Sequence, residues 1–203
     1  MVRVRPVLTW AAFGIAIVVP IAVAATSPLL QWRSPVYIAA GFAGIVAMAL
    51  VLAQPLLARG YLPGLSARRS RRVHRWVGAA LVAAVAVHVG GLWLTSPPDV
   101  IDALTFTSPT PFSDWGVVAM WALFAAASFA VARPWWRIRP RVWRVGHTTL
   151  AALAVVCSVV HAILIEGTMG TVSKVALCAL VLTATAKVVF DLRPWTLLTR
   201  RRV

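Results

Sequence analysis

Four histidines are the side chains of this sequence best suited to chemistry, and they occur at one repeated spacing. His74 and His88 are fourteen residues apart, as are His147 and His161, and the 203 residues contain no other histidine. Fourteen residues of an α-helix turn through about 1400°, about 40° short of four full turns, so the members of a pair share one helical face. With a rise of about 1.5 Å per residue, they lie about 21 Å apart along the helix.

Paired imidazoles of this kind are suited to binding heme iron. Iron accepts imidazole nitrogen readily, and a six-coordinate heme takes one axial ligand on each side of its ring. If the two histidine-bearing helices run in the same direction and face each other, His74 lies level with His147, and His88 lies level with His161. The two levels would then hold two hemes across a hydrocarbon core about 30 Å thick. Histidines about 21 Å apart cannot share one zinc ion, whose ligands cluster at one level.

Two other roles for the histidines stay open. A single membrane histidine is often a hydrogen-bond partner between helices, worth about 0.6 kcal/mol on average. A set of histidines can also relay protons, although relays usually recruit Asp or Glu within the membrane, and this sequence places none at mid-depth. Because all four histidines follow one spacing in two helices, we favour ligation.

Six apolar stretches must supply the helices that position these histidines. The sequence is 61% hydrophobic and 12% charged, whereas an ordinary soluble domain has about 25% charged residues. Stretches of membrane-spanning length occur at about 7–25, 36–58, 73–95, 115–132, 147–165 and 171–190. The sequence therefore predicts an all-α fold, a six-helix transmembrane bundle that forms a single domain over residues 1–203. The first stretch is longer than the 7–15 residues of a typical signal-peptide core, so we interpret it as a span.

The basic residues predict how this bundle is oriented. Of the 20 Lys and Arg, the loops on one side would hold all except Arg33 and Lys174, including Arg3, Arg193 and the three arginines at 200–202. Basic loops stay cytoplasmic, so both chain ends are expected inside, in a multi-pass protein of the inner (cytoplasmic) membrane that contacts anionic lipid. The net charge of +15 is therefore attributed to topology and not to nucleic-acid binding, which would need a basic stripe on a soluble surface.

Arginines flank the two histidines that are predicted nearest the cytoplasm. Arg71, Arg72, Arg75 and Arg144 could hold heme propionates by charge-assisted hydrogen bonds, although topology alone would also place arginines there. Small residues are also expected where a heme ring approaches the backbone, and the candidates are Gly78, Gly91 and Gly146.

The segments HRWVGAALVAAVAVH (74–88) and HTTLAALAVVCSVVH (147–161) resemble the ferric reductase-like transmembrane domain. This domain is the six-helix heme b bundle of ferric reductases and NADPH oxidases, and the resemblance extends over nearly the whole chain. It implies that His74 and His147 hold an inner heme b, and that His88 and His161 hold an outer one. Electrons would pass from a cytoplasmic donor to an acceptor at the outer face, which the sequence does not name.

The sequence departs from those relatives in one respect. Ferric reductases and NADPH oxidases continue into a flavin and nicotinamide module, but here LRPWTLLTRRRV follows the sixth helix and no G-x-G-x-x-G occurs. The expected donor is therefore a separate flavoprotein, for which a basic cytoplasmic surface suits an acidic partner. The chain is interpreted as a membrane subunit of an oxidoreductase. The alternative is a heme-free scaffold or proton-linked carrier whose histidines bridge helices or relay protons.

Overall fold

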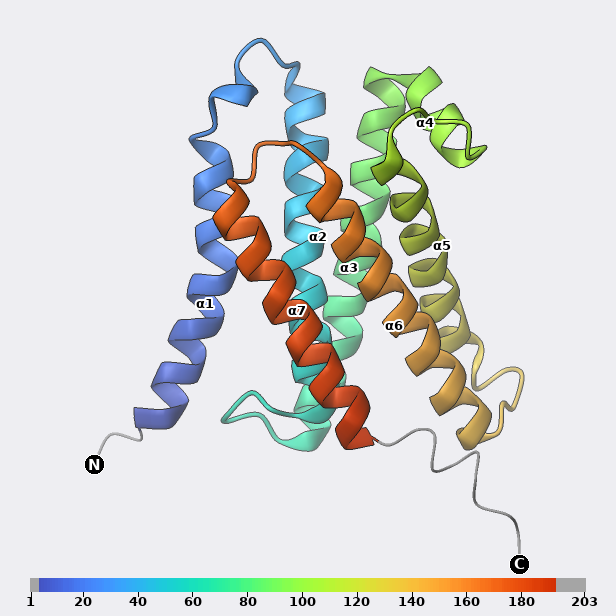
Figure 1. Ribbon diagram of the computed structural model, residues 1–203. Coiled ribbons are helices and arrows are strands. Elements are labelled where there is room, and N and C mark those ends of the chain that lie inside the picture. Colours follow the sequence, from blue (N-terminus) through green and yellow to red (C-terminus); the bar gives the residue numbers. More distant parts are fainter. Residues whose placement is uncertain (1–3, 193–203) are drawn as a thin grey trace, which may run out of the picture.

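The computed structural model describes residues 4–192, which are helical throughout apart from short connections (Figure 1). The elements are α1 (Val4–Ala25), the 3₁₀-helix η1 (Pro28–Leu30), α2 (Pro35–Arg59), α3 (Ala67–Thr95), α4 (Pro97–Leu104), α5 (Pro111–Ala132), α6 (Pro140–Leu164) and α7 (Thr171–Leu192). Within this range, six helices are long and apolar enough to cross a membrane: α1, α2, α3, α5, α6 and α7. The predicted all-α, six-span, multi-pass membrane fold is confirmed. The basic residues Arg3, Arg193 and 200–202 lie outside the described residues.

The two histidine-bearing helices begin earlier than hydropathy predicts. Helix α3 begins at Ala67 instead of 73, and α6 at Pro140 instead of 147. Hydropathy detects only the apolar part of a helix, whereas hydrogen bonding continues into the arginine-rich first turns. The Oγ of Ser66 accepts a hydrogen bond from the backbone N–H of Arg69 and caps α3. As a result, His74 and His147 each lie seven residues inside their helix.

The helices pack as two pairs with a third layer beside them. Helix α2 packs along α3 and α5 packs along α6, whereas α7 contacts both α2 and α6, and α1 lies at the edge against α2 and α7 (Figure 1). A core cluster forms where α2, α6 and α7 meet, and it comprises Met48, Leu52, Val155, Val159, Leu177, Cys178 and Val181. Cys157 and Cys178 are both buried free thiols.

Both ends of the bundle can be identified from its connections. Helix α1 begins and α7 ends at the same end as the turns 60–66 and 133–139, at the bottom of Figure 1. We call this end the termini face. The connections 26–34, 96–110 and 165–170 lie at the opposite face, where α4 forms a short helix in the longest connection. Because α3 and α6 both begin at the termini face, they run in the same direction, as the histidine spacing required.

Candidate functional site

The four histidines form two pairs between α3 and α6, the pairs predicted from their spacing. The imidazole centres of His74 and His147 are 6.5 Å apart with their planes at 75°. Those of His88 and His161 are also 6.5 Å apart, at 79°. The pairs therefore have nearly the same geometry, one toward the termini face and one toward the opposite face. All four side chains are half-buried.

Each imidazole also bonds to the helix that precedes its own. The four Nδ1 atoms lie 2.7–3.2 Å from backbone carbonyl oxygens, His74 from Gln54, His88 from Ala40, His147 from Ala126 and His161 from Phe112. A carbonyl oxygen can only accept a hydrogen bond, so Nδ1 carries the proton in every case. In the neutral ring, Nε2 is then the nitrogen with a free lone pair. The backbone therefore sets all four histidines in the tautomer that can ligate a metal through Nε2.

The same hydrogen-bond pattern occurs twice along the chain. His74 and His147 bond carbonyls 20 and 21 residues earlier, and His88 and His161 bond carbonyls 48 and 49 residues earlier. Helices α2 and α5 supply the acceptors, and α3 and α6 supply the histidines. The pairs α2–α3 and α5–α6 are therefore two copies of one structural unit, each contributing one ligand to each level.

Two glycines that contact the imidazoles were not found from the sequence. A Cβ on Gly116 would lie 2.7 Å from the Cε1 and Nδ1 of His161, and a Cβ on Gly44 would lie 3.0 Å from the Nδ1 of His88. Each glycine lies four residues after the carbonyl that its histidine bonds, one helical turn along α5 or α2. A side chain at Gly116 would displace the imidazole, and one at Gly44 would crowd it. These glycines could be found from the sequence only if the carbonyl that bonds each histidine were already known, because each glycine lies one helical turn after that carbonyl.

The three glycines expected to face a heme ring lie against other groups. A Cβ on Gly91 would be 2.7 Å from the Cβ of Ala40, and one on Gly146 would be 2.9 Å from the Phe129 ring. A Cβ on Gly78 would be 3.3 Å from the Gln54 side chain. These glycines thus allow α2 to approach α3, and α5 to approach α6.

The two imidazoles of each pair are separated by a distance that suits a metal bound between them. With metal–nitrogen bonds of about 2.0 Å and ring centres about 1.1 Å beyond each nitrogen, two imidazoles on opposite sides of one metal have centres about 6.2 Å apart. The observed 6.5 Å agrees with that separation. Residues 4–192 contain no cluster of three or more His, Cys, Asp or Glu side chains that could hold a metal ion. Within the described residues, each pair thus offers two imidazoles at a separation that suits one metal bound between them.

The surroundings of the two levels differ. At the termini face, the Trp143 ring stacks on the imidazole of His147, with centres 5.3 Å apart and planes at 9°, and the Arg133 guanidinium lies 4.4 Å above the Trp143 ring. Neither residue was selected from the sequence as part of the site. The predicted propionate ligands Arg71, Arg72, Arg75 and Arg144 all have exposed side chains, and their role stays a prediction.

At the opposite face, a buried lysine supports the end of α6. Lys174 of α7 is only 9% exposed, and its ammonium donates to the carbonyl oxygens of Ile165 at 2.6 Å and Ile163 at 3.4 Å. These carbonyls lie two and four residues after His161, at the C-terminal end of α6, where carbonyls lack partners within the helix. The ammonium also complements the negative end of the helix dipole. Lys174 was interpreted from sequence only as an outer-side charge, because its partners are on another helix.

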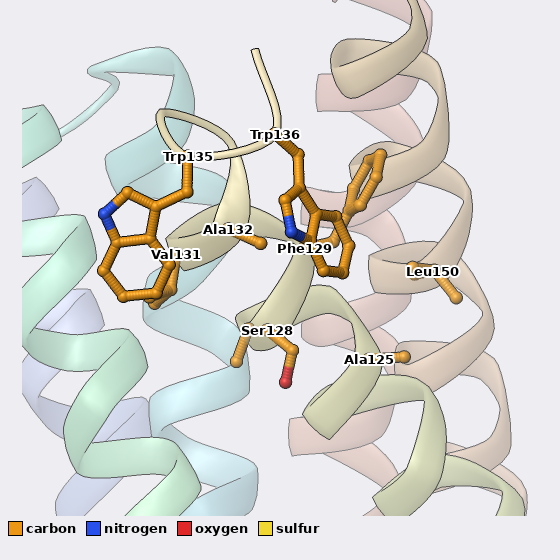
Figure 2. A pocket seen from close by; sticks show the side chains of 9 residues that line it. Ala125, Ser128, Phe129, Val131, Ala132, Trp135, Trp136 and Leu150 are labelled. Atoms are coloured by element: carbon orange, nitrogen blue, oxygen red, sulfur yellow. The ribbon is translucent and has the colours of Figure 1, made fainter. Parts of the chain in front are cut away.

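A hollow of about 630 Å³ lies on the outer side of the α5–α6 pair, near the termini face (Figure 2). Its walls are apolar, and Figure 2 shows Trp135 and Trp136 above Phe129 and Ala132 of α5, with Leu150 of α6 on the far side. Ala125 and Ala127 line it and flank Ala126, which accepts the hydrogen bond of His147. The hollow therefore lies behind the histidine site and does not open between the paired imidazoles.

Comparison with known proteins gives one match. Residues 40–158 match the protein family described as ferric reductase like transmembrane component, which is 119 of the 203 residues. The matched range includes His74, His88 and His147 and ends three residues before His161. It covers most of α2, all of α3, α4 and α5, and most of α6, and so includes most of both structural units. No curated protein and no solved structure matches the chain.

Proposed function

The chain belongs to the family of ferric reductase-like transmembrane components, and from that premise we propose that it carries electrons across the membrane through two hemes b. The membership and the six spans make it a membrane electron-transfer subunit. The two cofactors, their ligands, and the electron donor and acceptor belong to the proposal.

The observation that carries the proposal is the equal separation of the two imidazole pairs. Both are 6.5 Å apart, which suits a metal bound on both sides by imidazole at about 2.0 Å. A heme held by such a pair would supply one-electron redox chemistry. In this proposal, His74 and His147 bind one iron through Nε2, and His88 and His161 bind the second.

The rest of the chain holds these ligands in place. Carbonyls of α2 and α5 keep each Nδ1 protonated and each ring oriented. Gly44 and Gly116 leave space for the imidazoles at the opposite face. Because a heme lies between α3 and α6 in this arrangement, those two helices must stay apart, and they make little backbone contact with each other.

The direction of electron flow follows from the proposed orientation. The basic connections at the termini face, with arginines among residues 59–75 and 133–144, are proposed to lie in the cytoplasm of a cell with an inner membrane. They suit a separate, acidic flavoprotein as donor. The acceptor would be reached at the opposite face, from the heme of His88 and His161.

A heme-free scaffold is the second candidate, and one observation favours it. The imidazole-to-carbonyl bonds do join α2 to α3 and α5 to α6, which is what helix-bridging histidines would do. This role uses only Nδ1, however. It accounts neither for the cross-pairing of α3 with α6 nor for two separations of equal size.

The test is a reduced-minus-oxidised absorbance spectrum of the detergent-purified chain, with heme quantified per polypeptide. The proposal predicts bis-imidazole heme b bands and a ratio near two. Colourless protein from heme-replete cells would reject it in favour of the scaffold.

A further inference from the structure

We propose that Arg133 and Trp143 form a carboxylate-binding site that holds a propionate of the heme bound by His74 and His147. The inference rests on the proposed function, because the carboxylate is supplied by the heme. It differs from the arginine set predicted from sequence, which included neither residue.

The first observation is a pair of hydrogen-bond donors that lack an acceptor. The Nε1 of Trp143 is buried and has no hydrogen-bond partner within residues 4–192. The guanidinium of Arg133 lies over the same ring, 4.4 Å from its centre. Indole and guanidinium groups donate hydrogen bonds and accept none, so neither can satisfy the other. A buried donor without a partner costs free energy, which an acceptor at the Nε1 edge of the indole, beside the guanidinium, would recover.

The second observation is that the chain has no carboxylate to place there. It contains five acidic residues, and four of them are at the opposite face: Asp99, Asp102, Asp114 and Glu166. The fifth, Asp191, accepts a hydrogen bond from Tyr61 and forms an ion pair with Lys187 at 3.2 Å. No Asp or Glu side chain of the chain is therefore available as the acceptor, whereas a propionate of the proposed heme is a carboxylate at this level. A carboxylate matches the planar donor fork of arginine better than other acceptors do.

The third observation is that the Arg133–Trp143 site lies beside His147 and has no equivalent beside His74, the other histidine of the pair. Trp143 lies one turn before His147 and stacks on its imidazole. The corresponding residue one turn before His74 is Ser70, which is buried and donates to the Leu57 carbonyl at 2.6 Å. The polar group of α3 at this position is thus satisfied by α2, whereas the buried donor of α6 at the equivalent position has no partner within residues 4–192. Because Nε1 is covered from solvent, a group that enters from within the bundle fits it better than a side chain of a docked protein.

The site also has an electrostatic consequence. A propionate held against Arg133 has its negative charge compensated close to the iron. Without that cation, the uncompensated charge favours the ferric state, which carries one more positive charge than the ferrous state. Removal of Arg133 should therefore lower the midpoint potential of this heme and leave the heme of His88 and His161 unchanged.

Potentiometric titration of the full-length chain tests the proposal, with Trp143→Phe and Arg133→Gln as the variants. Trp143→Phe keeps an aromatic ring against His147 and removes only the N–H donor. The controls are Trp136→Phe and Arg137→Gln, which alter exposed side chains at the same face. For Arg133→Gln we expect about a tenfold shift toward the oxidised form of one heme, equal to about 59 mV for one electron. Trp143→Phe should shift the same heme in the same direction by less.

A second measurement separates propionate binding from a packing effect. Resonance Raman propionate modes should change in both variants and in neither control. When the chain is instead loaded with heme dimethyl ester, wild type and Trp143→Phe should have equal potentials, because the carboxylate that accepts the Nε1–H hydrogen bond is absent. Arg133→Gln should still differ from wild type, because the arginine charge acts on the iron directly. The site is rejected if two hemes bind with unchanged potentials and propionate modes, or if the difference between wild type and Trp143→Phe persists with the ester. Failure of the proposed function is distinct, since wild type would then bind no heme.

Discussion

Replacing Gly116 by alanine should remove the heme proposed at the opposite face and leave the other in place. The added Cβ would lie 2.7 Å from two atoms of the His161 ring, whereas ordinary contact begins at 3.4 Å. Both atoms belong to the imidazole, so the whole ring must shift. The Gly116 contact is part of the α5–α6 unit and touches no residue of the other level.

The structure gives the size of this displacement. Restoring ordinary contact needs a shift of about 0.7 Å, and a comparable lengthening of the 2.7 Å bond to the Phe112 carbonyl stretches it to about 3.4 Å, where the hydrogen bond is weak. A shift of this size also breaks a metal bond of about 2.0 Å. Loss of the hydrogen bond costs about 1 kcal/mol and overpacking costs about 1–3 kcal/mol. The better helix propensity of alanine offsets about 1 kcal/mol.

The chain provides graded controls for this experiment. Gly44→Ala makes the equivalent change beside His88, but its Cβ would lie at 3.0 Å, so the effect should be smaller. Gly41→Ala in the same helix meets no atom within 4 Å and should stabilise the protein slightly, because alanine is the better helix former. Heme content per polypeptide and the reduced-minus-oxidised spectrum should therefore fall in the order Gly41→Ala, Gly44→Ala, Gly116→Ala.

One result would refute this reasoning. If Gly116→Ala retains two hemes with the wild-type spectrum, His161 is not held against α5 in the way described. Equal losses in Gly116→Ala and Gly41→Ala would likewise show that the helix, and not the imidazole contact, is sensitive to substitution.

Three further outcomes are expected. His88→Ala and His74→Ala should each remove one heme of two and leave different residual potentials, measured by redox titration of each variant. Lys174→Met should lower the thermal stability in detergent, because two carbonyls at the end of α6 lose their partner, at about 1–3 kcal/mol, while Lys174→Arg should recover part of the loss. Ser70→Ala should cost about 1 kcal/mol through the unpaired Leu57 carbonyl, with heme content unchanged; a melting curve equal to that of wild type would contradict this.

Much of the architecture could be predicted because its signals are local. A run of apolar residues is enough to identify a span, so six helices were found at nearly the observed positions. Helix periodicity placed His74 and His88 on one face, and the same spacing placed His147 and His161 level with them. The start of α3 was missed because its first turns are rich in arginine and depend on the Ser66 cap.

The partners of the histidines could not be predicted in the same way. The carbonyls that fix His88 and His161 are 48 and 49 residues away, and any residue can supply a backbone carbonyl. Gly44 and Gly116 matter only because those carbonyls lie one turn before them. The sequence directed attention to Gly78, Gly91 and Gly146, which are near the histidines along the chain but pack against neighbouring helices.

The sequence by itself determined the number of spans. It also determined that each histidine pair of one helix shares a face, with the same fourteen-residue spacing in both helices. These features follow from hydropathy and helical periodicity, which act within one segment. Only the tertiary structure decided which nitrogen of each imidazole is free, which glycines make room for the rings, and that Arg133 and Trp143 stack beside His147. These features depend on how α5 packs against α6 and α2 against α3, and packing brings together residues whose separation along the chain carries no periodic signal.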